Sequence, residues 1–352
     1  MRRVHPWRKA GTFALLSLLG VLLLLASCSQ GGKSPESVPK PIKIGLSMDS
    51  FVVERWIRDR DIFVSTAEAL GAQVIVQVAN EDPEVQSEQI MALKNQGIDV
   101  LVVVANNGKL LGPVVRQVHD SGIPVISYDR LVLNGKCDLY ISYDNVKSGE
   151  LMAQYLVHRL KHKKVMRFVI VNGARSDNNS TLMNQGYHRV LDPLVKEGRA
   201  KILDEIWLKA WSSDEAERAF SKAIPTLGNF DGVIAADDLI AEPVIRVLAQ
   251  RRMLDHVLVT GMDADLLACQ HIVQGTQAMT VYKPIAPLAQ KAAKYAIMLA
   301  KHEPLNITQF ISDGTYQIPY VKLEPIPVDA KNMMSVIVRD GFHRKDEIYR
   351  RM

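Results

Sequence analysis

Several short apolar segments of this chain end abruptly on charged or amide residues. Residues 125–128, 233–236 and 279–282 are three of these segments. The polar residues that follow such segments are Asp129, Arg130, Asp177, Asn179, Asp237, Asp263 and Lys283. Ligands of an open parallel sheet bind beyond the carboxyl ends of its strands. The recurrence of polar residues at this position predicts one crevice that binds a small polar molecule.

The residue types at these positions suit a sugar. A sugar carries neighbouring hydroxyl groups around patches of C–H bonds, so its site needs forked charged or amide side chains and an aromatic face. Charge-assisted hydrogen bonds are stronger than neutral ones, and a site built to pair a hydroxyl group rejects a ligand that lacks it. Trp56 and Trp211 are candidate stacking platforms, and Arg55 adds another forked donor beside Trp56.

Each of these residues also has a purely structural interpretation. A polar residue after a strand is often only the cap of the next helix, and this applies to Asp177, Asp237 and Asp238. A neighbouring acid and base, such as Asp129 and Arg130, can form a surface ion pair of little energetic value. The tryptophans can be core residues, and a Lys-Pro pair can be a strand end followed by the first residue of a helix. Because so many of these residues share one topological position, we favour the binding site.

The sequence gives no support to an enzyme, a metal site, a cofactor or nucleic-acid binding. The predicted crevice has no nucleophile–histidine pair and no His-rich ligand set. The nine histidines are scattered and are interpreted as surface residues, and Cys137 and Cys269 are expected to be free thiols. Residues 1–27 carry four of the cations and no acid, so without them the formal net charge falls from +5 to +1. A near-neutral protein has no electrostatic footprint for nucleic acid.

From residue 42 onward, strand-like and helix-like segments alternate. Strand-like segments begin near Ile42, Gln73, Val100, Val125, Leu139, Arg167, Lys201, Val233, Val257 and Met279. Helical spacing fills residues 51–70, 85–96, 109–121, 146–162, 180–197, 212–226, 239–252, 264–274 and 284–301. This alternation predicts an α/β fold with parallel sheets, helices on both faces and right-handed crossovers.

Ten or more strands are many for one sheet, so we predict two Rossmann-like lobes joined by a multi-strand hinge. The N-terminal sugar-binding lobe is predicted to comprise residues 41–144 and 284–319. The C-terminal sugar-binding lobe is predicted to comprise residues 145–283 and 320–352. The cationic end of the chain, residues 342–351, is interpreted as a solvated helix end.

The first residues are typical of an export signal, with basic residues followed by an apolar stretch from Gly11 to Ala26. A permanent membrane anchor is the alternative, but this stretch is slightly shorter than the roughly 18–20 residues that span a bilayer. Residues 25–28, Leu-Ala-Ser-Cys, resemble the bacterial lipobox, although Cys28 could also be an ordinary cysteine beside a signal. We predict a signal peptide in residues 1–27, lipidation of Cys28 and a flexible tether in residues 28–40. The protein would then be extracytoplasmic and lipid-anchored to the bacterial membrane.

The chain resembles a known family, the periplasmic D-xylose-binding proteins. The matching blocks are residues 54–56 (ERW), 58–63 (RDRDIF), 128–130 (YDR), 140–145 (YISYDN), 176–179 (SDNN), 261–265 (GMDAD), 275–277 (GTQ), 280–284 (TVYKP) and 340–343 (DGFH). The resemblance covers roughly residues 42–345 and implies the type I periplasmic-binding-protein fold, a pentose ligand and no catalysis.

By position, the resemblance implies a ligand-binding role for individual residues. One lobe would be lined by Arg55, Trp56, Asp129 and Arg130. The other lobe and the hinge side would be lined by Asp177, Asn179, Trp211, Asp263 and Lys283. One departure bears on the ligand: the family typically has Asn-Asp where this chain has Asp237-Asp238. An amide that donates and accepts is there replaced by a carboxylate that only accepts.

We interpret the chain as a hinged clamp, in which a sugar docks in an open cleft and gains contacts to the second lobe when the lobes close. The sequence thus predicts an extracytoplasmic lipoprotein that captures an aldopentose, D-xylose by the resemblance, and delivers it to an ABC sugar permease. The same clamp could instead serve a membrane histidine kinase or chemoreceptor, and the ligand-site residues do not separate these partners. A repressor of the LacI type would need a helix-turn-helix where this chain has an export signal.

Overall fold

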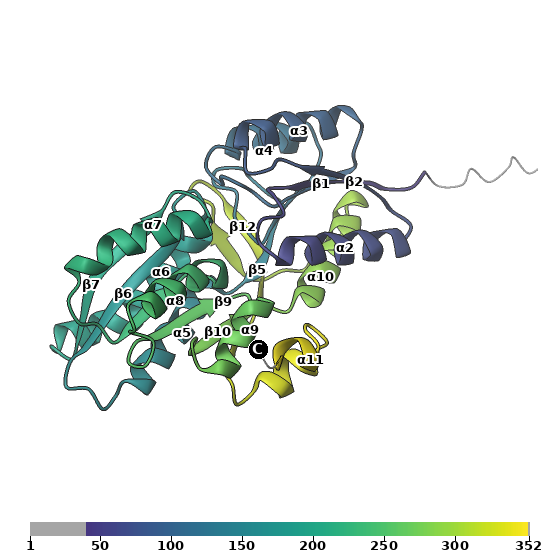
Figure 1. The fold of residues 1–352 in the computed structure, drawn as a ribbon. Helices are drawn as coiled ribbons and strands as arrows, with labels where there is room; N and C mark the ends of the chain where they lie inside the picture. Colours follow the sequence, from purple (N-terminus) through teal and green to yellow (C-terminus); the bar gives the residue numbers. More distant parts are fainter. Residues whose placement is uncertain (1–39, 351–352) are drawn as a thin grey trace, which may run out of the picture. The chain divides into compact units, whose positions relative to one another are not determined.

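The computed structural model describes residues 40–350, which form two sheets with flanking helices (Figure 1). The predicted signal peptide, Cys28 and nearly all of the predicted tether lie outside the described residues. Among the helices of residues 40–350, none has both the length and the apolar character needed to cross a membrane.

The first sheet has seven strands in the order β11-β12-β5-β4-β3-β1-β2. These strands are β1 (Lys43–Met48), β2 (Gln73–Val78), β3 (Val100–Val103), β4 (Val125–Tyr128), β5 (Leu139–Tyr143), β11 (Phe310–Ser312) and β12 (Gln317–Leu323). Neighbouring strands are parallel except β11 and β12. The helices of this lobe are α2 (Arg55–Ala69), α3 (Pro83–Asn95), α4 (Gly112–Asp120) and α10 (Ile285–Ala300).

The second sheet has six strands in the order β13-β10-β9-β8-β6-β7. These strands are β6 (Met166–Ala174), β7 (Ala200–Leu208), β8 (Gly232–Ala235), β9 (Leu258–Met262), β10 (Met279–Tyr282) and β13 (Ile326–Val328), of which only β13 pairs antiparallel. The helices of this lobe are α5 (Asn145–Arg159), α6 (Asn178–Lys196), α7 (Ser213–Ala223), α8 (Asp238–Gln250) and α9 (Leu266–Gln274).

The strands nearest the site are short and buried along their whole length. This holds for β3, β4, β8 and β10 and is typical of parallel strands with helices on both faces. Asp177 precedes α6 and accepts a hydrogen bond from Asn179 N, while Asp237 precedes α8 and accepts one from Ile240 N. Each aspartate therefore satisfies an otherwise free amide of the first helical turn. The polar residue after the strand thus begins the helix at the carboxyl edge of the sheet.

Within residues 40–350, the chain passes between the two sheets three times, after β5, after β10 and after β12. Tyr143, the last residue of β5, donates its hydroxyl hydrogen to the carbonyl oxygen of Pro284 and so ties the first two crossings together. Strand β12 pairs with β5 as far as Leu323, so the boundary predicted between residues 319 and 320 falls inside a strand of the first sheet. The other lobe boundaries remain predictions.

The C-terminal segment, residues 333–348, is packed against the second lobe. It contains a π-helix, η2 (Met334–Val338), and a short helix, α11 (Lys345–Ile348). Met333, Ile337 and Ile348 are buried in a small core with side chains of α9 and β10. The prediction of a solvated helix end at residues 342–351 is therefore wrong for Ile348, which anchors α11.

His343 overturns the prediction that all histidines lie at the surface. It is 3% exposed, and its Nε2 lies 2.8 Å from the carbonyl oxygen of Ala264. Burial lowers the pKa of His343, so a neutral ring donates this hydrogen bond through Nε2. The prediction of free thiols is confirmed for Cys137 and Cys269, both of which are buried.

Candidate ligand-binding site

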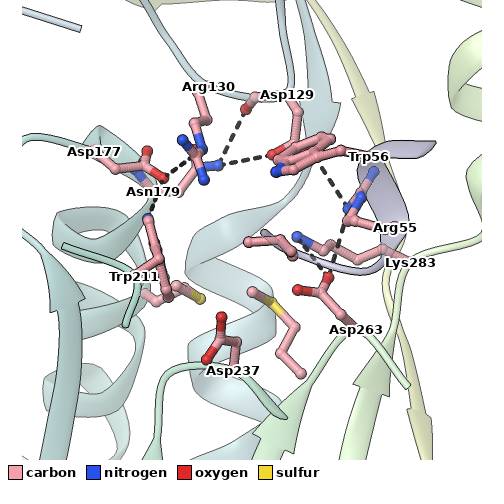
Figure 2. Close-up of a pocket in the computed structure, with 13 residues that line it drawn as sticks. Arg55, Trp56, Asp129, Arg130, Asp177, Asn179, Trp211, Asp237, Asp263 and Lys283 are labelled. Atoms are coloured by element: carbon pink, nitrogen blue, oxygen red, sulfur yellow. Dashed lines mark hydrogen bonds and ion pairs between the residues drawn. The ribbon is translucent and has the colours of Figure 1, made fainter. Parts of the chain in front are cut away.

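The ten predicted site residues line one pocket (Figure 2). They are Arg55, Trp56, Asp129, Arg130, Asp177, Asn179, Trp211, Asp237, Asp263 and Lys283. The empty space between them, counted together with the open solvent at its mouth, measures about 300 Å³. Val53, Met183 and Met262 complete the lining. Sequence reasoning missed these three because it searched for polar and aromatic residues, whereas apolar side chains that contact C–H groups look like ordinary core residues.

The first lobe contributes four of the ten residues. Arg55 and Trp56 begin α2, and Asp129 and Arg130 directly follow β4. Asp129 has a φ of +60°, in the left-handed region that Asp visits more readily than most residues. This turn places two oppositely charged side chains at the pocket.

The second lobe contributes the other six, each beside a strand end or a helix start. Asp177 and Asn179 stand at the start of α6, Trp211 follows β7, and Asp237 caps α8. Asp263 and Lys283 are the first residues after β9 and β10. The site is thus built at the carboxyl edges of both sheets, where the sequence predicted it.

Arg55 lies among three carboxylates. Its Nε lies 2.9 Å from Asp59 Oδ2, and its Nη1 lies 3.4 Å from Asp129 Oδ2 and 3.5 Å from Asp263 Oδ1. Asp59 also accepts a hydrogen bond from the Tyr128 hydroxyl. Asp59 was not predicted as a site residue, although its spacing of four residues from Arg55 on one helix face is a recognised signal for an ion pair.

Arg130 and Asn179 connect the two lobes. Arg130 Nη1 donates to Asp49 Oδ2 at 2.7 Å in the first lobe, and Arg130 Nε lies 3.0 Å from Asp177 Oδ2 in the second. Asn179 Nδ2 donates to Asp129 Oδ1 at 3.1 Å. The two lobes therefore touch through charged and amide side chains at the pocket itself.

The two tryptophans belong to the hydrophobic core and also line the pocket, so both interpretations hold for the same residues. The Trp56 ring centre lies 4.8 Å from the guanidinium carbon of Arg55 and 5.3 Å from that of Arg130. Trp211 Nε1 donates to Asp177 Oδ2 at 3.2 Å. A Cβ atom at Gly173 would lie 2.3 Å from the Trp211 ring, so the ring depends on a glycine at that position.

Several buried polar atoms at the pocket lack a hydrogen-bond partner among residues 40–350. They are Arg55 Nη1, Trp56 Nε1, Asp129 Oδ2 and Asp263 Oδ1. Leaving a buried donor or acceptor unpaired costs about 1–3 kcal/mol, and more for a charged group. Two donors and two acceptors around one pocket are therefore suited to a polyhydroxylated ligand, whose hydroxyl groups both donate and accept.

Two acids of the pocket have opposite pKa shifts. Burial would raise the pKa of Asp129, but Lys283, Arg55 and Arg130 hold it below its ordinary value. Burial and the nearby Asp263 raise the pKa of Asp237 to about 8. These two carboxyl groups differ because, among the described residues, a cation lies within ion-pair distance of Asp129 but not of Asp237.

Residues 44–304 match the family model described as a periplasmic binding protein domain. The chain belongs to this family. The expected type I periplasmic-binding-protein fold is confirmed, and the matched range contains all ten predicted site residues.

Relatives of this periplasmic binding protein include two described as D-xylose-binding periplasmic proteins. The protein from Haemophilus influenzae is 40% identical over 337 residues, which cover 96% of this chain and 98% of that protein. The protein from Escherichia coli is 38% identical over 310 residues, which cover 88% of this chain and 93% of that protein. The predicted resemblance is therefore confirmed over nearly the whole chain.

Solved structures agree on the fold. An ABC transporter solute binding protein from Clostridium phytofermentans with bound β-D-glucose superposes with a TM-score of 0.80 at 25% identity. The match covers 87% of this chain and 99% of that one. This periplasmic binding protein thus has the architecture of a solute receptor.

Asp238 differs from its neighbour in this periplasmic binding protein. Its side chain points away from the pocket lining: Oδ1 accepts from Gln277 Nε2 at 2.7 Å, and Oδ2 accepts from Thr280 Oγ1 at 2.8 Å. Of the paired aspartates, only Asp237 reaches the pocket. In the described part of the chain, no group of three or more His, Cys, Asp or Glu residues is arranged to hold a metal ion.

Proposed function

We propose that this protein is a non-enzymatic sugar receptor whose ligand is an aldopentose, D-xylose in particular. The observation that supports this proposal is the convergence of three cations, four carboxylates, one amide and two tryptophans on one pocket. Such a lining offers forked hydrogen bonds to neighbouring hydroxyl groups and flat faces to C–H patches. The names of the two relatives at 40% and 38% identity support the choice of D-xylose among aldoses.

Calorimetric titration of protein lacking residues 1–27 tests this function. D-xylose, D-ribose, L-arabinose and D-glucose are compared, and D-xylose is expected to bind most tightly. Trp211→Ala is expected to weaken binding strongly. Trp207→Ala is the matched control, because Trp207 lies near the end of β7, four residues before Trp211, but outside the pocket. Its ring centre lies 3.9 Å from the guanidinium carbon of Arg175. The absence of heat with every aldose would contradict the proposal.

Closure of the lobes is the proposed mechanism. Arg130 with Asp177, Asn179 with Asp129, and Arg55 with Asp263 link the lobes at the pocket, so a bound sugar among these groups adds contacts to both lobes at once. The ligand shifts the equilibrium toward the closed form by its extra affinity for that form. Small-angle scattering with and without D-xylose should detect a more compact protein in the presence of sugar, and an unchanged profile would argue against closure.

The proposed partner is an ABC sugar permease, and the proposed location is outside the cytoplasm on a lipid at Cys28. The alternative partner is a membrane sensor kinase or chemoreceptor. Uptake of labelled D-xylose by cells with and without this gene separates the two: loss of uptake supports the permease, whereas loss of xylose-induced transcription with normal uptake supports the sensor. Cys28→Ser should release the protein from the membrane fraction if Cys28 carries the lipid.

A further inference from the structure

Asp237 stands apart from the other carboxylates that line the pocket. Asp129, Asp177 and Asp263 each have an arginine or lysine nitrogen within 3.5 Å. Among residues 40–350, Asp237 has no cation within ion-pair distance. Figure 2 shows its carboxyl group in the pocket without a contact to the three cations drawn there. Asp237 is therefore the one acid of the lining that has no charge partner.

The backbone fixes the orientation of this carboxyl group. Asp237 is 3% exposed, and its Oδ1 accepts the Ile240 amide hydrogen at 2.9 Å as the cap of α8. The cap directs one oxygen to the helix and leaves the other for the pocket. An ionised carboxylate buried without a cation is costly, and such a group usually takes up a proton instead.

The described elements around Asp237 supply both acids and cations, but none of these cations lies within ion-pair distance of its carboxyl group. Asp263 follows β9, Lys283 follows β10, Arg130 follows β4, and Tyr187 lies on α6. Burial and Asp263 raise the pKa of Asp237 to about 8, while the Ile240 amide, Lys283 and Arg130 oppose this shift without cancelling it. The Tyr187 hydroxyl is buried and, among the described residues, has no hydrogen-bond partner.

We propose that Asp237 is a neutral carboxylic acid at neutral pH and donates its proton in a hydrogen bond to a hydroxyl oxygen of the bound sugar. This inference rests on the proposed function and adds the protonation state of one contact. A carboxylic acid carries one donor and an accepting oxygen, as an amide does, whereas a carboxylate only accepts. Because it donates this proton, Asp237 would select ligands that place a hydrogen-bond-accepting oxygen next to its carboxyl group.

The sign of the pH dependence follows from this role. A ligand that binds the protonated form has its full affinity below the pKa of Asp237 in the sugar-free protein, which is about 8 in this structure. Affinity weakens as the pH rises through that value and approaches a tenfold loss per pH unit above it. Binding also raises the pKa of Asp237, so the complex takes up protons.

Titration with D-xylose at several pH values tests the proposal, again with protein lacking residues 1–27. Between about pH 6 and about pH 9, the Kd of the wild-type protein should rise about tenfold. Titration near pH 8 in two buffers of different ionisation enthalpy should detect uptake of a fraction of one proton per sugar. An infrared band of a protonated carboxyl group, absent from Asp237→Asn, should be present in the sugar complex near pH 7.

Two variants at position 237 separate the proton from other causes of pH dependence. Asp237→Asn keeps a good helix cap and a donor without a titratable group, so its Kd should change less than about twofold over the same pH range. Asp237→Ala removes the donor, so near pH 6 its Kd should exceed that of Asp237→Asn by about tenfold. Thermal melting of both variants verifies that they fold.

The outcomes distinguish this proposal from the proposed function. A wild-type protein that binds D-xylose equally at both pH values, or a pH dependence that survives in Asp237→Asn, overturns the neutral donor and leaves the sugar receptor intact. A wild-type protein that binds no aldose at any pH overturns both.

Discussion

The two walls of the pocket hold buried charge in different ways. On the wall from the first lobe, Arg55 and Arg130 lie against Asp49, Asp59 and Asp129, and each carboxylate has a guanidinium nitrogen within 3.4 Å. On the wall from the second lobe, three aspartates line the pocket beside a single lysine. They are Asp177, Asp237 and Asp263, with Lys283.

This difference is accompanied by different pKa shifts of single residues. On the first wall, Lys283, Arg55 and Arg130 hold the pKa of Asp129 below its ordinary value despite its burial, whereas burial raises the pKa of Asp59. On the second wall, burial raises the pKa of Asp177 despite the nearby Arg130, and it raises the pKa of Asp237 to about 8. The pocket therefore holds both a carboxyl group with a lowered pKa, Asp129, and one with a strongly raised pKa, Asp237.

The largest expected effect on D-xylose binding comes from removing the arginine that contacts both walls. Arg130 joins Asp49 of the first wall to Asp177 of the second. Arg130→Met leaves both carboxylates without their guanidinium, and removing one member of a buried ion pair costs about 3–5 kcal/mol. D-xylose binding should weaken by more than about a hundredfold by calorimetry. Arg130→Lys is the control, because it keeps the positive charge but not the forked guanidinium group. Its affinity for D-xylose should lie between those of the wild-type protein and Arg130→Met.

The second prediction uses the opposite pKa shifts of Asp237 on the second wall and Asp129 on the first. Because the folded pKa of Asp237 is raised, its proton stabilises the fold most at low pH, and this stability is lost as the pH rises from about 4 to about 8. Relative to Asp237→Asn, the free energy of unfolding of the sugar-free protein should fall by about 2 kcal/mol between about pH 6 and about pH 8. Urea unfolding measures this free energy at each pH. Free energies of unfolding that depend on pH in the same way in the wild-type protein and in Asp237→Asn would contradict a neutral Asp237.

Asp129→Asn provides the opposite sign on the first wall. The folded pKa of Asp129 is lowered, so its contribution is present above the unfolded pKa of about 4 and is lost as the pH falls below that value. The destabilisation caused by Asp129→Asn should therefore shrink in acid. A destabilisation that grows in acid would show that the two walls do not differ as described.

The third prediction concerns the stacking platform of the second wall. Gly173→Ala places a Cβ atom 2.3 Å from the Trp211 ring, so the ring must move. Sugar affinity should fall about tenfold, since a displaced aromatic side chain loses about 1–1.5 kcal/mol of contact. In a Trp211→Ala background the same substitution should have no further effect, because interacting residues are not additive. An additive double mutant would mean that Gly173 acts elsewhere.

The smallest effect is expected outside both walls. Arg58 of α2 donates to the Phe342 carbonyl oxygen at 2.5 Å, and its guanidinium carbon lies 4.6 Å from the centre of the Phe342 ring. This contact links the first lobe to the C-terminal segment. Arg58→Ala should speed sugar release about two- to threefold, as for a partly exposed cation–π contact of about 0.5–1 kcal/mol. Stopped-flow tryptophan fluorescence measures the rate of sugar release. An unchanged rate would mean that the contact between Arg58 and Phe342 does not stabilise the closed form.

Sequence reasoning predicted the lining residues well because they obey a local rule. Each polar residue of the lining follows a strand or begins a helix, and the chain itself reveals such positions. The partners of these residues obey no local rule. Asp49 and Arg130 are 81 residues apart, and His343 and Ala264 are 79 apart, so neither spacing nor periodicity predicts the contact. The lack of a cation beside Asp237 is equally unpredictable from the sequence, because it depends on where the distant turns at Arg130 and Lys283 place their side chains.

Strand β12 has a consequence for how the chain folds. It pairs with β5, and the Tyr320 hydroxyl donates to the carbonyl oxygen of Tyr143, at a sequence separation of 177. The first sheet therefore cannot be completed until strands β6 to β10 of the second lobe have been synthesised. Pairings of such separation are slow to form, because the loop-closure entropy is lost before the contacts are gained. During synthesis, β5 therefore lacks its partner on one side until β12 has been made. A chain that stops before residue 317 would leave β5 as an open sheet edge.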